Sequence, residues 1–193
     1  LFEYSDIYLR HINYKPMNYM KNIIVTVFIF VGLQTYAQKK DLDVPYVPTD
    51  QSVVDAMLDL AGLKSGDRHY DLGCGDGRIV ITAAKRGAIA TGIDLDPQRI
   101  QEANENAKKE GVTDKVTFIE GDLFDFDFSK ADVLTLYLLP SVNLKLRPKI
   151  LDEMKPGTKV VSHAFDMGDW KPKKEIEVDG HTLFLWTVPA REK

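Results

Sequence analysis

A glycine-rich turn lies near the centre of the sequence, Asp71-Leu72-Gly73-Cys74-Gly75-Asp76-Gly77-Arg78. It follows a short strand-like run of residues and precedes a helix-like one. Because glycine has no Cβ, a turn built from it adopts positive φ and lets a ligand contact the backbone. A helix that begins near Gly77 presents its unpaired N–H groups to that ligand. The pattern predicts a binding site for a nucleotide-type cofactor.

Two cofactor classes use such a turn, and the residues around the glycines favour one of them. A dinucleotide site needs G-x-G-x-x-G after the first strand, and Arg78 stands where the third glycine is required. The carboxylates of Asp71 and Asp76 would also repel a pyrophosphate. S-adenosylmethionine (SAM) carries an ammonium and a sulfonium, so two carboxylates suit it. We therefore expect SAM as the cofactor, bound by Asp71, Gly73, Gly75, Asp76, Gly77 and Arg78.

A second acidic position, Asp94, follows the strand expected at residues 88–93. It lies about twenty residues beyond the glycine turn, the spacing at which a carboxylate binds ribose hydroxyls. An ionised carboxylate can accept hydrogen bonds from both hydroxyls at once. Leu95 would then lie against the adenine ring. Asp96 precedes Pro97 and is instead predicted to cap the next helix.

These residues resemble the class I SAM-dependent methyltransferases, and the glycine turn resembles their motif I. A third pair, Asp122 and Leu123, follows the strand expected at residues 115–119. The resemblance implies that Asp122 accepts a hydrogen bond from the adenine amino group and that Leu123 contacts the ring face. The alternative is that each stretch is an ordinary turn at the end of a strand.

Strand-like and helix-like segments alternate along the chain from residue 49 onward. Thr49 is expected to cap the first helix. Residues 131–137 are mostly apolar and are expected to form a central, buried parallel strand. Such alternation predicts right-handed crossovers and a doubly wound sheet. The fold class is therefore α/β, with a Rossmann-like and mostly parallel sheet whose strands bind the cofactor at their carboxyl ends.

The C-terminal third departs from simple alternation. Ser141 is expected to cap a helix that runs toward Met154, and Pro148 should kink or shorten it. Asp179-Gly180 lies between two strand-like segments, residues 175–178 and 182–188, a pattern that predicts a C-terminal antiparallel hairpin at the end of the sheet.

The composition fits one globular domain, with 193 residues of which 44% are hydrophobic. A net charge of −4 and a pI near 5.6 argue against a nucleic-acid partner, because nucleic-acid-binding surfaces are basic. The single cysteine, Cys74, cannot form an internal disulfide, and we interpret it as a small filler of the turn rather than a reactive thiol. No His/Cys cluster has the spacing of metal ligands, so no metal is expected.

The chain is expected to divide into a leader at residues 1–37, a linker at 38–48 and the methyltransferase domain at 49–193. Residues 23–33 are almost wholly apolar and follow Lys21, which is typical of a signal peptide or a membrane anchor. Met17 or Met20 would be a natural start, so residues 1–16 are interpreted as an over-extended translation. The leader predicts export to the periplasm or membrane tethering, whereas SAM is made in the cytosol, and the residues do not choose between the two compartments.

Several stretches recur together in one family, namely residues 46–49, 71–78, 136–143, 161–163 and 168–172. On these residues the chain resembles, over about residues 44–190, the small protein-lysine methyltransferases. That family includes a broad-specificity archaeal enzyme and the mitochondrial enzymes that modify the ATP synthase c subunit and the adenine nucleotide translocase. The resemblance implies a protein partner with an accessible lysine.

The same resemblance assigns roles around the acceptor. It places Leu136 at the cofactor and implies that Tyr46, Tyr137 and Asn143 line the acceptor channel. His163 or Asp166 is a candidate to accept the proton that the incoming amine loses.

The residues after the expected fourth strand limit the acceptor chemistry. Methyltransferases of planar amides and adenine amines usually carry Asp/Asn-Pro-Pro-Tyr/Phe at this place, whereas this chain has Tyr137-Leu138-Leu139-Pro140. Because no acidic or amide group is present to hold a planar NH₂, an aliphatic amine or another small nucleophile is favoured as the acceptor. Two alternatives stay open, a small-molecule methyltransferase and an exported binding domain that kept the fold without catalysis.

Overall fold

The computed structural model describes residues 46–191. The expected leader and most of the linker lie outside the described residues, so the signal peptide, the export and the membrane proximity through residues 23–33 stay predictions. Between residues 46 and 191, no helix has the length and apolar character needed to cross a membrane.

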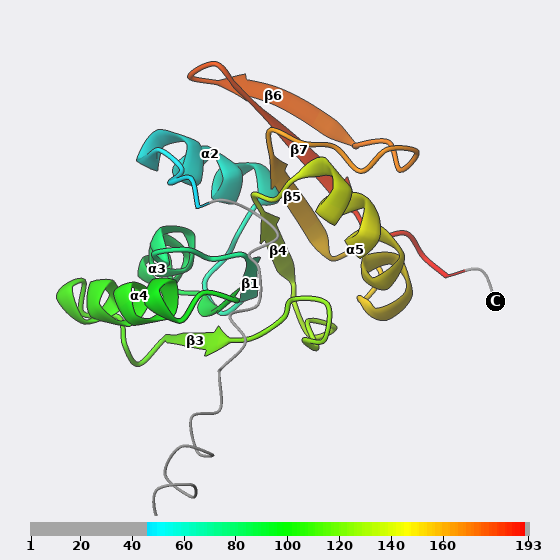
Figure 1. The fold of residues 1–193 in the computed structure, drawn as a ribbon. Coiled ribbons are helices and arrows are strands. Elements are labelled where there is room, and N and C mark those ends of the chain that lie inside the picture. The colour runs from blue at the N-terminus through cyan, green and yellow to red at the C-terminus, as the bar shows by residue number, and fades with distance from the viewer. Residues whose placement is uncertain (1–45, 192–193) are drawn as a thin grey trace, which may run out of the picture. The chain divides into compact units, whose positions relative to one another are not determined.

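The helices and strands follow one another in the expected order (Figure 1). The helices are α2 (Gln51–Ala61), α3 (Arg78–Lys85), α4 (Pro97–Lys109) and α5 (Pro140–Glu153). The strands are β1 (Arg68–Leu72), β2 (Ile89–Asp94), β3 (Val116–Glu120), β4 (Val133–Leu136), β5 (Lys159–His163), β6 (Lys174–Val178) and β7 (His181–Thr187).

The strands form one sheet in the order β3-β2-β1-β4-β5-β7-β6. Neighbours from β3 to β5 pair in parallel, whereas β7 is antiparallel to both β5 and β6. The chain moves outward from β1 in one direction and from β4 in the other, so the connections diverge above these two strands and leave a crevice for a ligand. The predicted α/β class with a C-terminal hairpin is confirmed.

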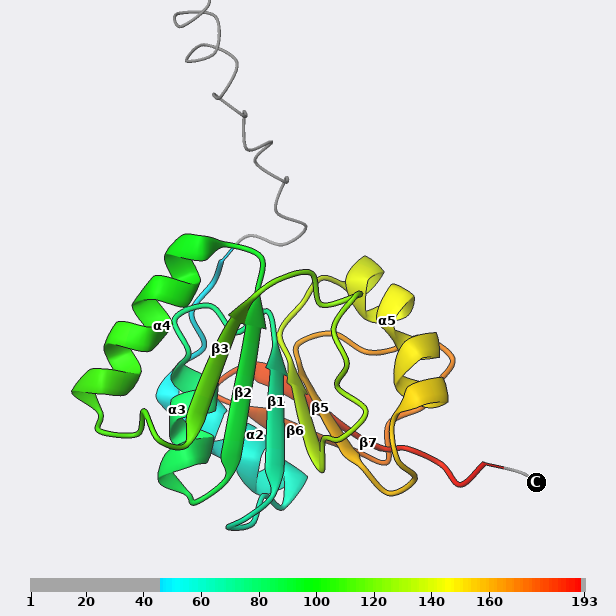
Figure 2. The same ribbon diagram turned by 90° about the horizontal axis from the view of Figure 1, so that it is seen from below.

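Helices cover both faces of the sheet (Figure 2). The buried side chains of α2 and α3, with Ala107 of α4, belong to one hydrophobic cluster, and the buried apolar side chains of α5 belong to a second cluster. Leu72 of β1 packs in the α5 cluster. Because successive side chains of a strand point to opposite faces, Asp71 faces α2 and α3 on the other side.

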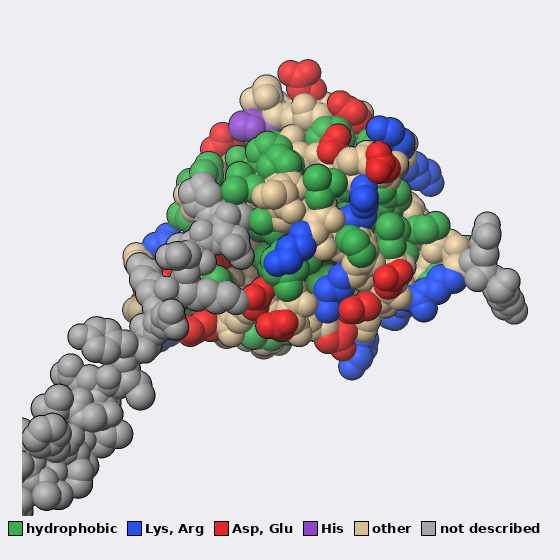
Figure 3. Space-filling view, turned by 45° about the vertical axis from the view of Figure 1, so that its right-hand side comes forward, with side chains coloured by type: hydrophobic (Ala, Val, Ile, Leu, Met, Phe, Trp, Pro, Cys, Tyr) green, Lys and Arg blue, Asp and Glu red, His purple; other side chains and the backbone are tan. Residues whose placement is uncertain are grey.

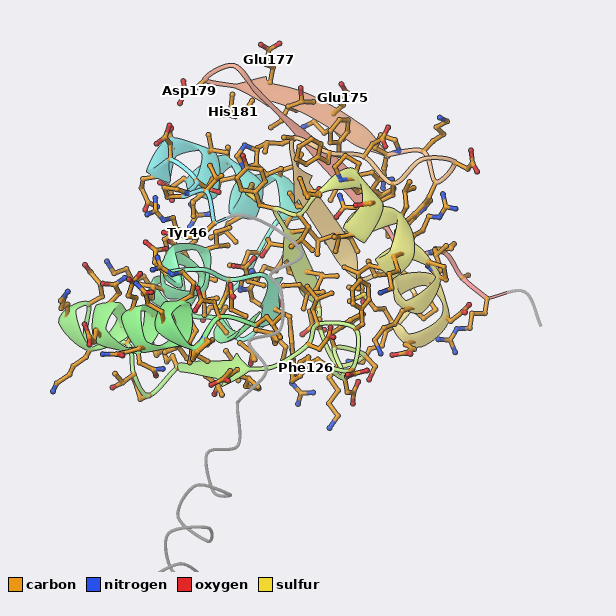
Figure 4. All side chains as sticks on the ribbon, in the orientation of Figure 1. Tyr46, Phe126, Glu175, Glu177, Asp179 and His181 are labelled. Atoms are coloured by element: carbon orange, nitrogen blue, oxygen red, sulfur yellow. The ribbon has the colours of Figure 1, made fainter. Side chains whose placement is uncertain are left out.

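The hairpin between β6 and β7 turns at the predicted residues. Asp179 has φ 49° and Gly180 has φ 78°, as a two-residue turn matched to the strand twist requires. Glu175 and Glu177 are exposed on the edge strand β6 and point away from the body of the domain in Figure 4. Charges on an edge strand oppose pairing with another sheet.

Two predicted helix starts are wrong. The first helix begins at Gln51 after Asp50, because the Thr49 hydroxyl lies 3.4 Å from His163 Nδ1 and its carbonyl accepts a hydrogen bond from Arg78. The last helix begins at Pro140 rather than after Ser141, since proline suits the first helical position, where no N–H is needed. That helix also continues through Pro148, anchored by buried residues on either side of it. The predicted cap at Asp96 is confirmed, because its side chain accepts from the Gln98 N–H at 2.9 Å.

Cys74 packs as predicted. A Cβ added to Gly92 would lie 2.7 Å from Cys74 Sγ, so the two residues fit only because position 92 is glycine. The thiol is buried, and burial raises its pKa well above the ordinary value. A thiol held in this form fills space and is a weak nucleophile.

Candidate active site

A cavity of about 240 Å³ lies at the carboxyl ends of the central strands. Residues of the loops that follow β1, β2, β3, β4 and β5 line it, together with residues 46–49. It brings together most of the predicted site residues, which are Tyr46, Asp71, Gly73, Gly75, Asp76, Arg78, Asp94, Leu95, Asp122, Leu123 and Tyr137. Four others do not line it, namely Gly77, Leu136, Asn143 and His163.

Asp71 is the most deeply buried carboxylate of the cavity wall. It is 2% exposed, and burial raises its pKa to about 7. Its Oδ1 accepts a hydrogen bond from the Thr135 hydroxyl at 2.6 Å, and its Oδ2 has no partner among the described residues. A buried carboxylate with an unused oxygen fits a ligand that brings a cation, because a cation supplies the missing partner and favours the ionised form.

Asp76 differs from Asp71 because Arg78 neutralises it. The Arg78 guanidinium donates to Asp76 Oδ2 at 2.7 Å and to Oδ1 at 3.0 Å. Burial raises the pKa of Asp76, but the guanidinium outweighs that effect and holds the pKa below its ordinary value. Arg78 also donates to the Thr49 carbonyl at 2.7 Å and so fastens the 46–49 segment to the turn. The charge available to a cationic ligand therefore comes from Asp71 and Asp94.

Asp94 stands at the end of β2 beside the glycine turn. Its Oδ2 accepts from the Gly75 N–H at 2.8 Å and its Oδ1 accepts from the Asp96 N–H at 2.9 Å. These two bonds fix the carboxylate plane, and each oxygen keeps a lone pair for a ribose hydroxyl.

The expected adenine end lies after β3. Asp122 Oδ1 accepts from the Phe124 N–H at 2.9 Å, which orients the side chain at the cavity wall. Leu95 and Leu123 supply apolar surface to the same cavity. The arrangement suits a planar ring held between apolar side chains.

The glycines of the turn leave room for neighbouring side chains as well as for a ligand. A Cβ on Gly75 would lie 2.5 Å from the Tyr46 ring, and one on Gly73 would lie 2.7 Å from Leu138. The Tyr46 ring therefore packs on the glycine turn, close to the start of α3 (Figure 4). The guanidinium of Arg99, 4.6 Å from the ring centroid, lies over the same tyrosine. Local spacing gave no signal for Arg99.

Gly77 is needed for packing. Its φ is 79°, and a Cβ there would meet Phe118 at 2.7 Å. Leu136 is fully buried in the α5 cluster and does not line the cavity.

Tyr137 and Phe165 line the cavity after β4 and β5. The Tyr137 ring stacks on His163 with 3.9 Å between centroids. His163 is 2% exposed, and burial together with the neighbouring His181 lowers its pKa to about 4. It is therefore neutral at pH 7 and supports Tyr137 from behind.

Asn143 does not line the cavity but contacts the backbone of a residue that does. Its Nδ2 donates to Ser162 Oγ and to the Phe165 carbonyl, each at 3.2 Å. These bonds hold the backbone of Phe165, a residue that sequence reasoning missed. The candidate proton acceptor Asp166 accepts instead from the Gly168 N–H at 3.0 Å and does not line the cavity. Among the residues from 46 to 191, no group of three or more His, Cys, Asp or Glu could hold a metal ion.

The sheet order, the glycine turn and the buried carboxylates define a class I SAM-dependent methyltransferase. The family model described as the ANTKMT methyltransferase domain matches residues 71–174. The chain belongs to this family.

Two curated relatives and one solved structure illustrate the similarity. A protein-lysine N-methyltransferase from Saccharolobus islandicus is 46% identical over 151 residues, which are 75% of this chain and 94% of that protein. The adenine nucleotide translocase lysine N-methyltransferase from Mus musculus is 33% identical over 132 residues, 68% of this chain and 57% of that protein. The crystal structure of an RNA methyltransferase from Salinibacter ruber with S-adenosylhomocysteine is 52% identical, has a TM-score of 0.74, and covers 76% of this chain and 97% of its own.

Proposed function

We propose that the protein transfers methyl groups from SAM to the ε-amino groups of lysine residues in proteins. The observation that carries this proposal is the acceptor end of the cavity. The cavity residues that follow β4 and β5 are Tyr137, Leu138, Leu139 and Phe165, and they carry neither a carboxylate nor a carboxamide. Such a wall suits an aliphatic amine. The 46% identity with the archaeal protein-lysine enzyme over nearly its whole length supports the same acceptor.

The cofactor residues have separate roles in this proposal. Asp71 would receive the ammonium, Asp94 the ribose hydroxyls, and Asp122 with Leu95 and Leu123 the adenine. When bound, SAM supplies an electrophilic methyl group on its sulfonium. The protein has to align the amine with that group and keep water away from it.

A lysine must lose its proton before it can react. Its reference pKa is near 10.4, so deprotonation at pH 7 costs about 4.6 kcal/mol. Burial of the side chain between the Tyr137 and Phe165 rings disfavours the charged form and offsets part of that cost. His163 stays neutral behind Tyr137 and keeps the ring in place.

The cavity rim fits a protein surface. Tyr46 is 41% exposed and Val47 is 53% exposed, and both line the cavity. Apolar side chains at an open rim favour contact with a folded partner over enclosure of a small metabolite. A domain that only binds is not favoured, because most of the predicted cofactor residues meet in one cavity whose other end offers an apolar wall to an acceptor.

RNA is the competing acceptor, since the Salinibacter ruber structure is described as an RNA methyltransferase. The net charge of −4 disfavours it. Basic and acidic side chains are interspersed on the face shown in Figure 3, in place of the basic stripe that a phosphate backbone requires.

The test is transfer of a radiolabelled methyl group from SAM into a cell extract by the full chain. Label that resists ribonuclease, disappears with protease and maps to methyl-lysine by mass spectrometry is the expected result. Label that ribonuclease releases, or label in the small-molecule fraction only, would contradict the proposal. Asp94→Ala serves as the inactive control, and the exposed Asp125→Ala, which lies outside the cavity, as the matched active one.

A further inference from the structure

A chain of three buried polar side chains connects the cavity wall at Asp71 with the interior of the domain. His69 and Asp71 are two residues apart on β1 and therefore point to the same face of the sheet. Thr135 of β4 stands opposite Asp71 in the strand register. The Thr135 hydroxyl lies 2.9 Å from His69 Nε2 and 2.6 Å from Asp71 Oδ1. His69 and Thr135 are fully buried, and neither lines the cavity.

The hydrogen bonds in this chain have one direction. Burial lowers the pKa of His69 to about 3, so its ring is neutral and carries one N–H. Nδ1 has no partner among the described residues. A buried N–H without a partner costs more than a lone pair without one, so the proton belongs on Nε2. His69 Nε2–H then donates to Thr135, and the Thr135 hydroxyl donates to Asp71 Oδ1.

The direction decides which oxygen of Asp71 can bind a proton or a cation. Oδ1 already accepts from Thr135, whose other acceptor, the Tyr70 carbonyl, is more distant at 3.4 Å. The Thr135 oxygen is occupied by His69, so it is a poor acceptor for a proton carried on Oδ1. Oδ2 is the oxygen left for the cavity, which Asp71 lines.

The groups around Asp71 raise its pKa, so the hydrogen bond from Thr135 is needed to favour its ionised form. Asp94 on β2 and Asp76 in the turn are negative, and both raise the Asp71 pKa. Cys74 in the same turn is a neutral thiol, and Arg78 of α3 is engaged by Asp76. The α2 residues that are buried against the sheet are apolar, Val53, Val54, Met57, Leu58 and Ala61. Within residues 46–191, no salt bridge reaches Asp71.

We propose that His69, acting through Thr135, is a positioning residue that holds Asp71 as an acceptor for the ammonium group of SAM. The proposal rests on SAM as the methyl donor and is independent of the acceptor. It assigns His69 a role in cofactor binding although the residue lies outside the cavity.

The first test compares three ligands with the wild-type full chain by calorimetry. SAM and S-adenosylhomocysteine carry the ammonium, whereas 5′-methylthioadenosine lacks it and keeps the adenosine. Since the pKa of Asp71 is about 7, the Kd of the first two should rise roughly fifteenfold from pH 7 to pH 5.5. The Kd of methylthioadenosine should stay constant. Equal change for all three ligands, or a change for SAM alone, would overturn the proposal, and no binding of SAM at pH 7 would contradict the proposed function itself.

The second test uses variants behind the cavity. His69→Leu removes the donor to Thr135 and should weaken SAM and S-adenosylhomocysteine severalfold at pH 7, with methylthioadenosine unchanged. His69→Gln keeps an N–H and should restore most of the loss. Thr135→Val should weaken the same two ligands by roughly tenfold or more. The double variant should be no weaker than Thr135→Val, because His69 acts through the hydroxyl.

If the losses of affinity in His69→Leu and Thr135→Val add in the double variant, or if His69→Leu weakens the three ligands equally, His69 has only a packing role. Methylthioadenosine binding also reports whether each variant is folded, so a misfolded protein is recognised by the loss of all binding together.

Discussion

Asp94→Ala should abolish most of the affinity for SAM. The carboxylate is fixed by the N–H groups of Gly75 and Asp96, at 2.8 and 2.9 Å, and is therefore preorganised for two ribose hydroxyls. Each hydrogen bond to an ionised group contributes about 1.5 kcal/mol, so the pair contributes about 3 kcal/mol. That loss corresponds to a rise in Kd of roughly 150-fold. Calorimetric titration of the full chain with SAM measures it directly.

Methylthioadenosine sharpens this prediction because it keeps the ribose. It should lose the same factor as SAM in Asp94→Ala, in contrast to its indifference to changes at Thr135. Asp125→Ala, an exposed carboxylate outside the cavity, should leave both affinities unchanged. A rise in Kd below about fivefold, or a loss for SAM that methylthioadenosine does not share, would refute the ribose assignment.

Three further predictions concern the turn, the acceptor end and the buried histidine. Gly75→Ala should weaken SAM at least tenfold, because alanine disfavours φ +53° and its Cβ would meet Tyr46 at 2.5 Å; Tyr46→Ala in the same chain should recover part of the loss in the same titration. Asn143→Leu should lower kcat, since it releases the Phe165 backbone, while the Kd of SAM measured separately stays unchanged. His69→Leu should flatten the pH dependence of unfolding. Below pH 6.5 the His69 imidazole binds a proton in the unfolded chain but not in the folded protein, where its pKa is about 3. The wild type should therefore lose about 2 kcal/mol from pH 7 to pH 5 relative to the variant in denaturant titrations.

Local spacing predicted the parts of the site that depend on short stretches of backbone. The turn glycines adopt positive φ where the pattern placed them, and Asp94 reaches back to the Gly75 N–H from the next strand. The charge argument for SAM was only half complete. It used two carboxylates, but Arg78 pairs with Asp76, and such pairing depends on a side-chain rotamer that the pattern does not specify.

The rest of the site depends on contacts between distant segments. Arg99 lies over Tyr46, and Asn143 holds the backbone of Phe165, across 53 and 22 residues respectively, and no local period marks either pair. Thr135 was hidden for a different reason. It sits within an apolar run on a central strand, where threonine has strand propensity like its neighbours, and its partner is defined only by the register between β1 and β4.

The stability of the fold does not require the buried polar chain of His69, Thr135 and Asp71. His69, Thr135 and Asp71 occupy positions on two central strands where aliphatic residues would pack without unpartnered polar atoms. Removal of a buried polar group is costly where it leaves its partner unsatisfied, but the Nδ1 of His69 already has no partner among the described residues, and the Thr135 hydroxyl keeps its bond to Asp71 without His69. His69→Leu should therefore keep or raise stability, most clearly at acid pH, while it weakens SAM and spares methylthioadenosine. Opposite signs for stability and for cofactor affinity in one variant would indicate that these polar residues serve the ligand rather than the fold.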